Sequence, residues 1–170
     1  WASSTSTGQI ESQAGPHIVA DRHTVETVPD NAPGTCGNLP NIFPGSDYSI
    51  RLGNSDNGGY AESLQYRMTV DPNNPIFIYR YAVVLQDPGH SPSQQPFFEL
   101  KITDASGNLL DPASCSYFKV VSNSGLASNS DWESCGSTYY KKWSSVGVDL
   151  QDFADEDIIL EFTTSDCTQR

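Results

Sequence analysis

Residues Ile76–Leu110 read IFIYRYAVVLQDPGHSPSQQPFFELKITDASGNLL and decide the fold of the chain. The first ten, Ile76–Leu85, are apolar except for Arg80 and are rich in aromatic and β-branched residues. Pro75 and Pro88 flank the run and leave too little length for helical periodicity, so the pattern predicts a strand. Because both faces are apolar, we expect a central strand that is covered on both sides.

A second strand follows, because apolar and polar residues alternate over Phe97–Thr103. Its apolar face comprises Phe98, Leu100 and Ile102. Asp104–Asn108 has turn composition. The polar, proline-rich segment Gln86–Pro96 between the two strands is the connection where we expect a functional loop.

Similar strand patterns run through the rest of the chain, and no amphipathic helix or internal repeat is visible. The further predicted strands are residues 48–54, 61–70, 117–121, 146–150 and 158–164. Residues 122–136 read as a long polar loop. The sequence therefore predicts an all-β domain, a jelly-roll β-sandwich of about eight strands, over residues 34–170.

Residues 1–33 differ in composition and predict an extended N-terminal arm. Trp1–Gly15 is rich in Ser, Thr, Gln and Gly and reads as linker. His17–Val28 has strand composition. It is either an ordinary edge strand or an arm that pairs with the open sheet edge of another chain, which would give self-association through residues 17–28.

The formal net charge of −12 argues against nucleic acid and anionic membranes as partners. No apolar run reaches about 18 residues, so we expect no membrane insertion. The chain begins Trp1-Ala2-Ser3 without Met or a visible signal peptide, which indicates a mature product or an expressed fragment. Solubility explains the acidity most simply, and divalent-cation binding or a saline habitat is the alternative.

The four cysteines, Cys36, Cys115, Cys135 and Cys167, form no CxxC pair, so a zinc site is not expected. An even count in this composition predicts two disulfides in an oxidising compartment, with a pair of free buried thiols as the alternative. Three pairings are open. We favour Cys115–Cys135, which closes the polar loop, and Cys36–Cys167, which joins the ends of the domain.

Several motifs in order resemble a β-sandwich module of secreted Bacteroidota surface proteins. These are gliding-motility-associated or adhesin-like proteins exported by the type IX route. The motifs are SIRLGN (49–54), AESLQYRMTV (61–70), YAVVLQDPGH…QPFFELKITDASGN (81–108), CSY (115–117), YYKKWSSVGVDL (139–150) and FTTSDC (162–167). More distantly, the ending is similar to carbohydrate-binding and MAM-type jelly rolls. The resemblance implies a secreted, cell-surface location and a role in adhesion.

In that family FTTSDC precedes a further, interior strand, whereas this chain stops at Thr168-Gln169-Arg170. The resemblance therefore implies a sheet that lacks one strand. Three explanations are open: a shortened chain, cleavage after Arg170, or a strand supplied by another chain, for which His17–Val28 is the candidate donor.

The sequence does not favour an enzyme. Of three histidines two lie in the arm, and no catalytic or phosphate-binding motif is present. The sequence suggests a structural calcium ion, because oxygen ligands gather around one predicted turn. They are Asp47, Asn54, Asp56, Asn57 and Glu62. A polar hairpin without a metal explains the same residues.

Glycan binding needs aromatic rings beside amide groups. The candidates come from the loop after residue 86 and from the aromatic residues near position 140: His90, Gln94, Gln95, Trp132, Tyr139 and Trp143. Core packing is the alternative for Trp143, and anchoring of its own loop is the alternative for Trp132.

The sequence thus predicts a non-catalytic extracellular binding or adhesion module, with a glycan or a neighbouring surface protein as ligand and calcium as the one expected cofactor. The first alternative is a structural subunit of a filament or surface layer assembled by strand donation. The second is an accessory domain of a secreted hydrolase.

Overall fold

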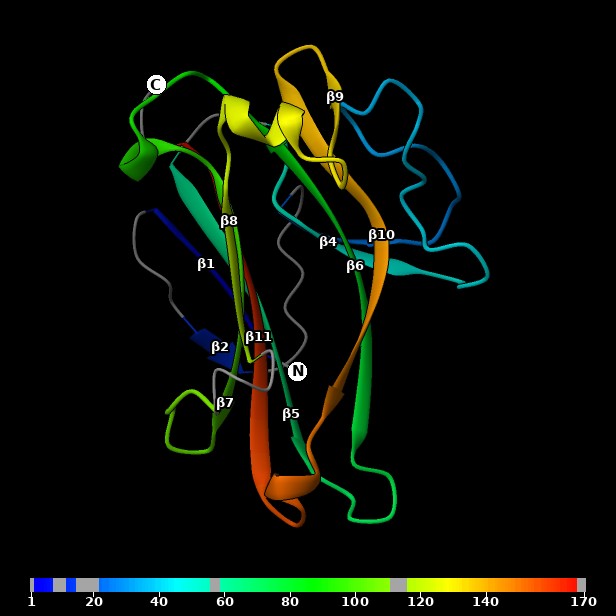
Figure 1. Ribbon diagram of the computed structural model, residues 1–170, viewed down its shortest axis with the longest axis vertical. Coiled ribbons are helices and arrows are strands. Elements are labelled where there is room, and N and C mark those ends of the chain that lie inside the picture. Colours follow the sequence, from blue (N-terminus) through cyan, green and yellow to red (C-terminus); the bar gives the residue numbers. More distant parts are fainter. Residues whose placement is uncertain (1, 8–11, 15–21, 56–58, 111–115, 168–170) are drawn as a thin grey trace.

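In a computed structural model, the chain forms an all-β fold of three antiparallel sheets, described over residues 2–7, 12–14, 22–55, 59–110 and 116–167 (Figure 1). The strands are β1 (Ala2–Thr7), β2 (Ser12–Ala14), β3 (His23–Glu26), β4 (Ser49–Leu52), β5 (Tyr60–Thr69), β6 (Ile76–Gln86), β7 (Phe97–Asp104), β8 (Tyr117–Val121), β9 (Glu133–Cys135), β10 (Thr138–Asp149) and β11 (Asp157–Ser165). Three short 3-10 turns are η1 (Pro92–Gln94), η3 (Ser124–Ser128) and η4 (Gln151–Phe153). The all-β prediction is confirmed.

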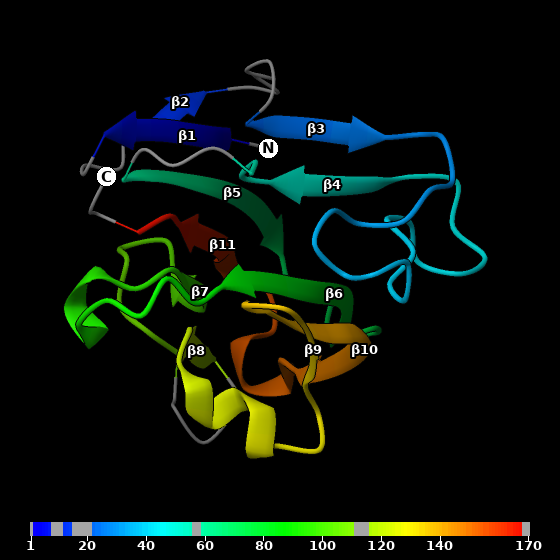
Figure 2. The same cartoon turned by 90° about the horizontal axis from the view of Figure 1, so that it is seen from above.

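The sheets are arranged in layers compatible with a β-sandwich (Figure 2). One layer is a six-stranded sheet in the order β2-β1-β5-β11-β7-β8, and the facing layer is a three-stranded sheet in the order β6-β10-β9. The β3-β4 pair forms a small third sheet beside them. Among the residues that the structure describes, no helix is long and apolar enough to cross a membrane.

The core lies between the two larger sheets, as the alternating strands predict. Ile102 of β7 and both Ile158 and Leu160 of β11 are completely buried. They meet Val148 of β10 in one cluster. A second cluster joins β6 and β7 to the loop after β8: Val83, Leu85, Phe98, Leu100, Leu126 and Trp132.

The position of β6 differs from the prediction of a central strand covered on both sides. Among the described residues β6 pairs with β10 alone and is the edge strand of its sheet. One face packs into the core, while Ile76 and Ile78 on the other face are 57% and 59% exposed. Both faces of the run are apolar in composition, and composition alone does not distinguish a buried face from an exposed one.

The N-terminal residues also depart from the predicted linker. β1 pairs antiparallel with the outer edge of β5, and β2 pairs with β1. β3, inside the predicted donor segment, pairs with β4 of the same chain, whereas residues 17–21 lie outside the described residues. The polar sequence ASSTST serves as a strand here because the open edge of β5 supplies the backbone partners that its composition does not predict.

The favoured disulfide pairing is wrong. Cys36 bonds to Cys135, with 5.7 Å between their Cα atoms, so neither Cys115–Cys135 nor Cys36–Cys167 forms. Cys167 is buried, and Cys115 lies outside the described residues. The prediction missed β9, which brings Cys135 beside the loop that holds Cys36.

Candidate functional site

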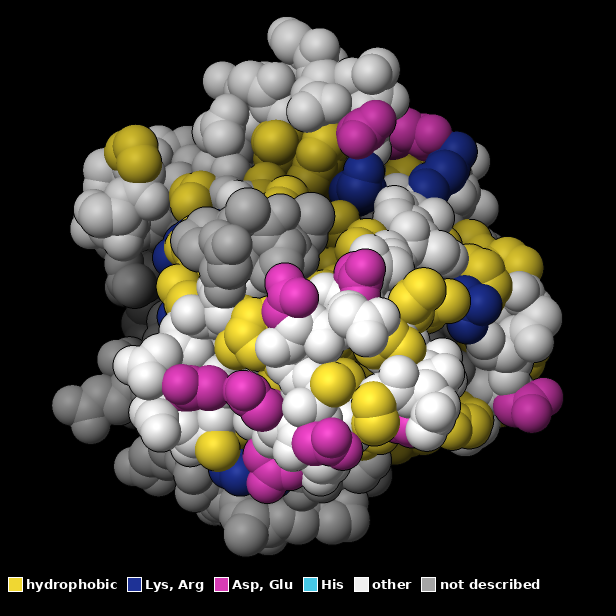
Figure 3. All heavy atoms as spheres, turned by 60° about the horizontal axis from the view of Figure 1, so that its bottom comes forward, with side chains coloured by type: hydrophobic (Ala, Val, Ile, Leu, Met, Phe, Trp, Pro, Cys, Tyr) yellow, Lys and Arg dark blue, Asp and Glu magenta, His cyan; other side chains and the backbone are white. Residues whose placement is uncertain are grey.

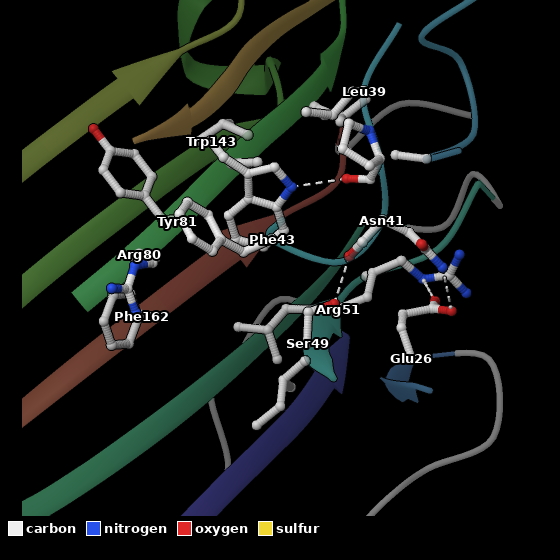
Figure 4. Close-up of a pocket in the computed structure, with 18 of the residues that line it drawn as sticks. Glu26, Leu39, Asn41, Phe43, Ser49, Arg51, Arg80, Tyr81, Trp143 and Phe162 are labelled. Carbon is white, nitrogen blue, oxygen red and sulfur yellow. Dashed lines mark hydrogen bonds and ion pairs between the residues drawn. The ribbon is translucent and has the colours of Figure 1, made fainter. Parts of the chain in front are cut away.

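A groove of about 800 Å³ opens between β6 and the β3-β4 pair. β6 forms one wall, β4 and the loop of residues 27–47 form the other, and the inner face of the six-stranded sheet forms the floor. Figure 4 shows this loop beside β6, with Phe43 and Trp143 next to each other. A second pocket of about 320 Å³ shares Leu52, Gly53, Val84 and Thr164 with the groove and extends it.

Aromatic rings from β6 and from three strands of the six-stranded sheet form an unbroken row along the wall and the floor. Tyr66 stacks on Phe77 with ring centroids 5.9 Å apart, and Tyr79 meets Phe162 edge-on at 5.5 Å. The remaining contacts, Phe77–Tyr79, Tyr79–Tyr81 and Tyr81–Phe98, continue the row. Tyr66, Phe77 and Tyr79 keep part of their surface exposed. The floor is therefore an apolar surface that a ligand can cover.

The loop wall is held in place by contacts with β10. The Trp143 indole Nε1 donates a hydrogen bond of 2.8 Å to the Pro40 carbonyl. The same ring meets Phe43 edge-on with centroids 5.9 Å apart, and the Cys36–Cys135 disulfide fixes the loop further along. Trp143 reaches the loop from a bulge, because two residues of β10 lie opposite Ala82.

Backbone groups of β6 point into the groove, which follows from its register with β10. The Pro75 carbonyl accepts from Leu150 N–H at 3.0 Å, and Asp87 N–H donates to the Ser137 carbonyl at 2.7 Å. Pro75 and Asp87, which flank β6, are both odd-numbered. Backbone groups point alternately to the two sides of an antiparallel strand. The odd residues of β6 therefore face β10.

The even residues of β6 present their N–H and C=O groups to the groove. Those that line the groove are Ile78, Arg80, Ala82 and Val84. Within the described part of the chain, no strand pairs with this edge.

The groove carries little net charge on an otherwise acidic protein. Its charged lining residues are Glu26, Asp30, Arg51 and Arg80, so the two signs cancel. Arg51 Nε lies 3.5 Å from Glu26 Oε1, and the Arg80 guanidinium lies 4.7 Å from the centroid of the Phe43 ring. On the face drawn in Figure 3, acidic side chains are spread among apolar and uncharged ones rather than gathered into one patch.

A buried carboxylate lies next to the groove. Arg22 Nη1 donates to Glu62 Oε1 at 3.0 Å, and the Glu62 side chain is only 1% exposed. Burial, with a smaller contribution from Asp166, raises the pKa of Glu62 to about 7, although Arg22 acts in the opposite direction. Glu62 Oε2 is buried without a hydrogen-bond partner. A Cβ on Gly53 would lie 3.6 Å from that oxygen.

Of the six predicted glycan contacts, only Trp143 lines the groove. Gln95 is buried, and its Nε2 donates to Asp87 Oδ1 at 2.6 Å. The Gln94 amide oxygen accepts from the Ser91 hydroxyl at 2.7 Å, and His90 is half-buried. These side chains shape the loop after β6.

Of the two remaining aromatic residues of that set, Trp132 lies in the core and Tyr139 packs against it. Trp132 is 9% exposed and packs in the cluster that contains Leu126, and Tyr139 packs against the same cluster. The structure therefore does not gather the six predicted residues around one surface.

The predicted calcium ligands are not brought together in the part that the structure describes. Asp47 precedes β4 and is exposed, whereas Asn54 follows the other end of that strand. Glu62 is buried in its pair with Arg22. Asp56 and Asn57 lie outside the described residues. No group of three or more His, Cys, Asp or Glu side chains suited to a metal occurs among the described residues.

Sequence reasoning missed most of the groove residues. A signal was present in Phe77, Tyr79 and Tyr81, which recur at every second position of the apolar run. This alternation is equally typical of a strand that packs on the core, and these rings do pack against the core. Leu39 and Phe43 in a proline-rich loop gave a weaker signal that the loop folds back onto the domain.

Comparison with protein-family models, curated proteins and solved structures found no match to this chain.

Proposed function

We propose that this chain is a non-catalytic extracellular binding module, and that the groove between β6 and the β3-β4 pair is its ligand site. The observation that carries the proposal is the open edge of β6 beside an aromatic floor. Binding sites are typically concave, mostly apolar and supplied with a few polar groups that fix orientation. Here the polar groups are the backbone of β6 and the side chains of the loop wall.

The Cys36–Cys135 disulfide supports an oxidising compartment, because structural disulfides persist mainly outside the cytosol. A bacterial cell-surface protein, with a glycan or a neighbouring surface protein as the ligand, remains the reading that the sequence motifs favour. A bracing calcium ion is part of the same proposal. Its test is a comparison of the unfolding temperature in calcium chloride and in EDTA.

Binding at the groove is tested by chemical-shift mapping with two sets of probes, neutral oligosaccharides and short extended peptides. Leu64→Lys places a charge in the groove, because Leu64 is half-buried on β5 and lines it. Leu109→Lys is the matched control, since Leu109 is 45% exposed and lies outside the groove. We expect at least one probe set to shift groove amides in the wild type and in Leu109→Lys, and Leu64→Lys to abolish the shifts.

The proposal fails if no probe perturbs the groove amides, or if Leu64→Lys, shown by its circular dichroism to be folded, binds as well as the control.

A structural subunit assembled by strand donation is the second candidate, and the same open edge of β6 favours it. The pairing of β3 with β4 inside one chain weighs against it, since the predicted donor segment is partly in use. Light scattering separates the two functions. A binding module is monodisperse and monomeric, whereas a donated strand gives polymers that disappear when residues 1–33 are deleted.

A further inference from the structure

We infer that the ligand of the groove is a single extended segment of a different protein, which adds a strand to the free edge of β6. The inference rests on the proposed function and names the class of ligand for the same site. The ligand would have apolar side chains at alternate positions and no net negative charge. Strand addition of this kind draws affinity from main-chain hydrogen bonds and specificity from alternate side chains.

The free edge of β6 is unusually suited to strand pairing. The strand is 11 residues long, it has no proline, and Arg80 is its one charged residue. Its register bulge lies in β10 rather than in β6. Natural proteins protect edge strands with short length, proline, bulges or charge. Apart from the loop of residues 27–47, which forms the other wall of the groove, β6 shows little of this protection, which indicates that another chain covers it.

The length of the groove sets the size of the segment. Residues Phe77–Val84 of β6 line it without interruption. Eight residues of strand span about 26 Å, so the ligand contributes a strand of about eight residues. Across this length, Ile78, Arg80, Ala82 and Val84 offer both backbone groups to the incoming strand.

The floor determines the pattern of the ligand. A strand beside β6 lies above the inner faces of β5 and β11, where Leu64, Tyr66 and Phe162 line the groove. Every second side chain of the ligand would point toward these residues, because side chains alternate across a strand. Apolar residues at those positions bury the aromatic surface, and polar residues at the others face outward.

The walls and the charge indicate a different protein rather than a second copy. The edge of β6 is recessed behind the loop of residues 27–47, so a single strand enters more readily than the edge of a folded domain. All described strands of this chain already have a partner strand. Two copies also carry −12 each and repel one another. A neutral or basic segment meets no such opposition.

The test uses a defined probe, an eight-residue peptide of alternating Val and Thr with blocked ends. Its matched control has the same sequence with all interior amides N-methylated, which removes the hydrogen-bond donors and keeps the side chains. We expect chemical-shift changes along β6, β5 and β11 with the first peptide and at least tenfold weaker binding of the second. A tenfold change corresponds to one or two net hydrogen bonds.

The protein supplies a second pair of variants. Ala82→Pro removes an N–H that faces the groove, and an edge position whose N–H has no ladder partner tolerates proline. Ala82→Val keeps the N–H and has strand propensity. We expect Ala82→Pro to weaken peptide binding at least tenfold while its circular dichroism spectrum stays the same as that of the wild type. We expect Ala82→Val to bind the peptide like the wild type.

The outcomes separate the inference from the proposed function. Equal binding of the methylated peptide, or peptide binding unaffected by Ala82→Pro, overturns strand addition and leaves the groove as a ligand site. If an oligosaccharide shifts the groove amides and neither peptide does, strand addition is likewise overturned and the groove remains a ligand site. Concentration-dependent dimers that lose their contact on Ala82→Pro assign the edge to a second copy and also overturn the inference. If no probe reaches the groove, both proposals fail.

Discussion

Cys36 and Cys135 are joined across 99 positions of sequence, and their bond ties the loop wall of the groove to β9. The loop contains no named strand between β3 and β4, and the hydrogen bond from Trp143 to the Pro40 carbonyl is a second contact that holds it. The disulfide therefore links the stability of the fold to the shape of the candidate site.

We expect the Cys36→Ser/Cys135→Ser variant to lose about 2–5 kcal/mol of unfolding free energy, since the bond closes a long loop. Peptide binding at the groove should weaken as well, because the wall is released. Urea unfolding with and without reductant measures the first effect. An unchanged unfolding midpoint in reductant would contradict the role given to the bond.

The buried Glu62 carboxylate predicts an unusual pH dependence. Its pKa of about 7 in the folded protein exceeds the usual value of 4.5 for a glutamate side chain, so the folded state binds a proton more tightly than the unfolded state does. This contribution to stability is fully present below about pH 4.5 and is lost as the pH rises toward 7. Its magnitude is at most about 3 kcal/mol.

Glu62→Gln should remove that part of the pH dependence, because an amide does not titrate. The measurement is the unfolding free energy of wild type and variant at intervals from pH 4.5 to 8. The exposed Glu156→Gln serves as control. If the unfolding free energy of the wild type changes with pH in parallel with that of Glu62→Gln between pH 4.5 and 8, the raised pKa assigned to Glu62 is wrong.

Trp143 should matter for the loop wall more than for the core. Trp143→Phe keeps a ring against Phe43 but removes the hydrogen bond to the Pro40 carbonyl, and we expect a loss of about 1 kcal/mol. The amides of Ala32 and Asn41, which are hydrogen-bonded within the loop, should then exchange faster with deuterium. Unchanged exchange at both amides would show that the indole does not hold the wall.

A matched pair of isoleucines tests the assignment of core and surface. Ile102 is completely buried between the sheets, whereas Ile78 on the outer face of β6 is 59% exposed. Ile102→Ala should cost about 2–5 kcal/mol of unfolding free energy, and Ile78→Ala less than about 1 kcal/mol. Similar losses for the two variants would mean that the outer face of β6 is covered.

Simple alternation predicted most of the sandwich. Phe98, Leu100 and Ile102 lie on the buried face of β7, and Ile158 and Leu160 do the same on β11. On these strands the face toward the other sheet is mostly apolar and the opposite face is mostly polar, and a period of two records that difference directly.

The features that the sequence did not predict depend on which elements become neighbours in the fold. A local sequence pattern does not contain that information. Ile76–Leu85 is apolar on both faces, yet β6 lies at a sheet edge. The cysteines could not be paired because β9 is three residues long and lies inside a polar loop. Trp132 in the same loop packs into the core. The groove is lined by residues from several segments that lie far apart in the sequence, so no single motif predicts it.

The free edge of β6 is the central claim, and residue-resolved amide exchange by NMR tests it most directly. In the free protein, the amides of Ile78, Arg80, Ala82 and Val84 should exchange rapidly, while those of Phe77, Tyr79, Tyr81 and Val83 should be protected by β10. The alternating Val–Thr peptide at saturation should protect the even-numbered amides as well. Protection of even and odd amides alike without peptide would show that the edge is already covered, and would contradict the account.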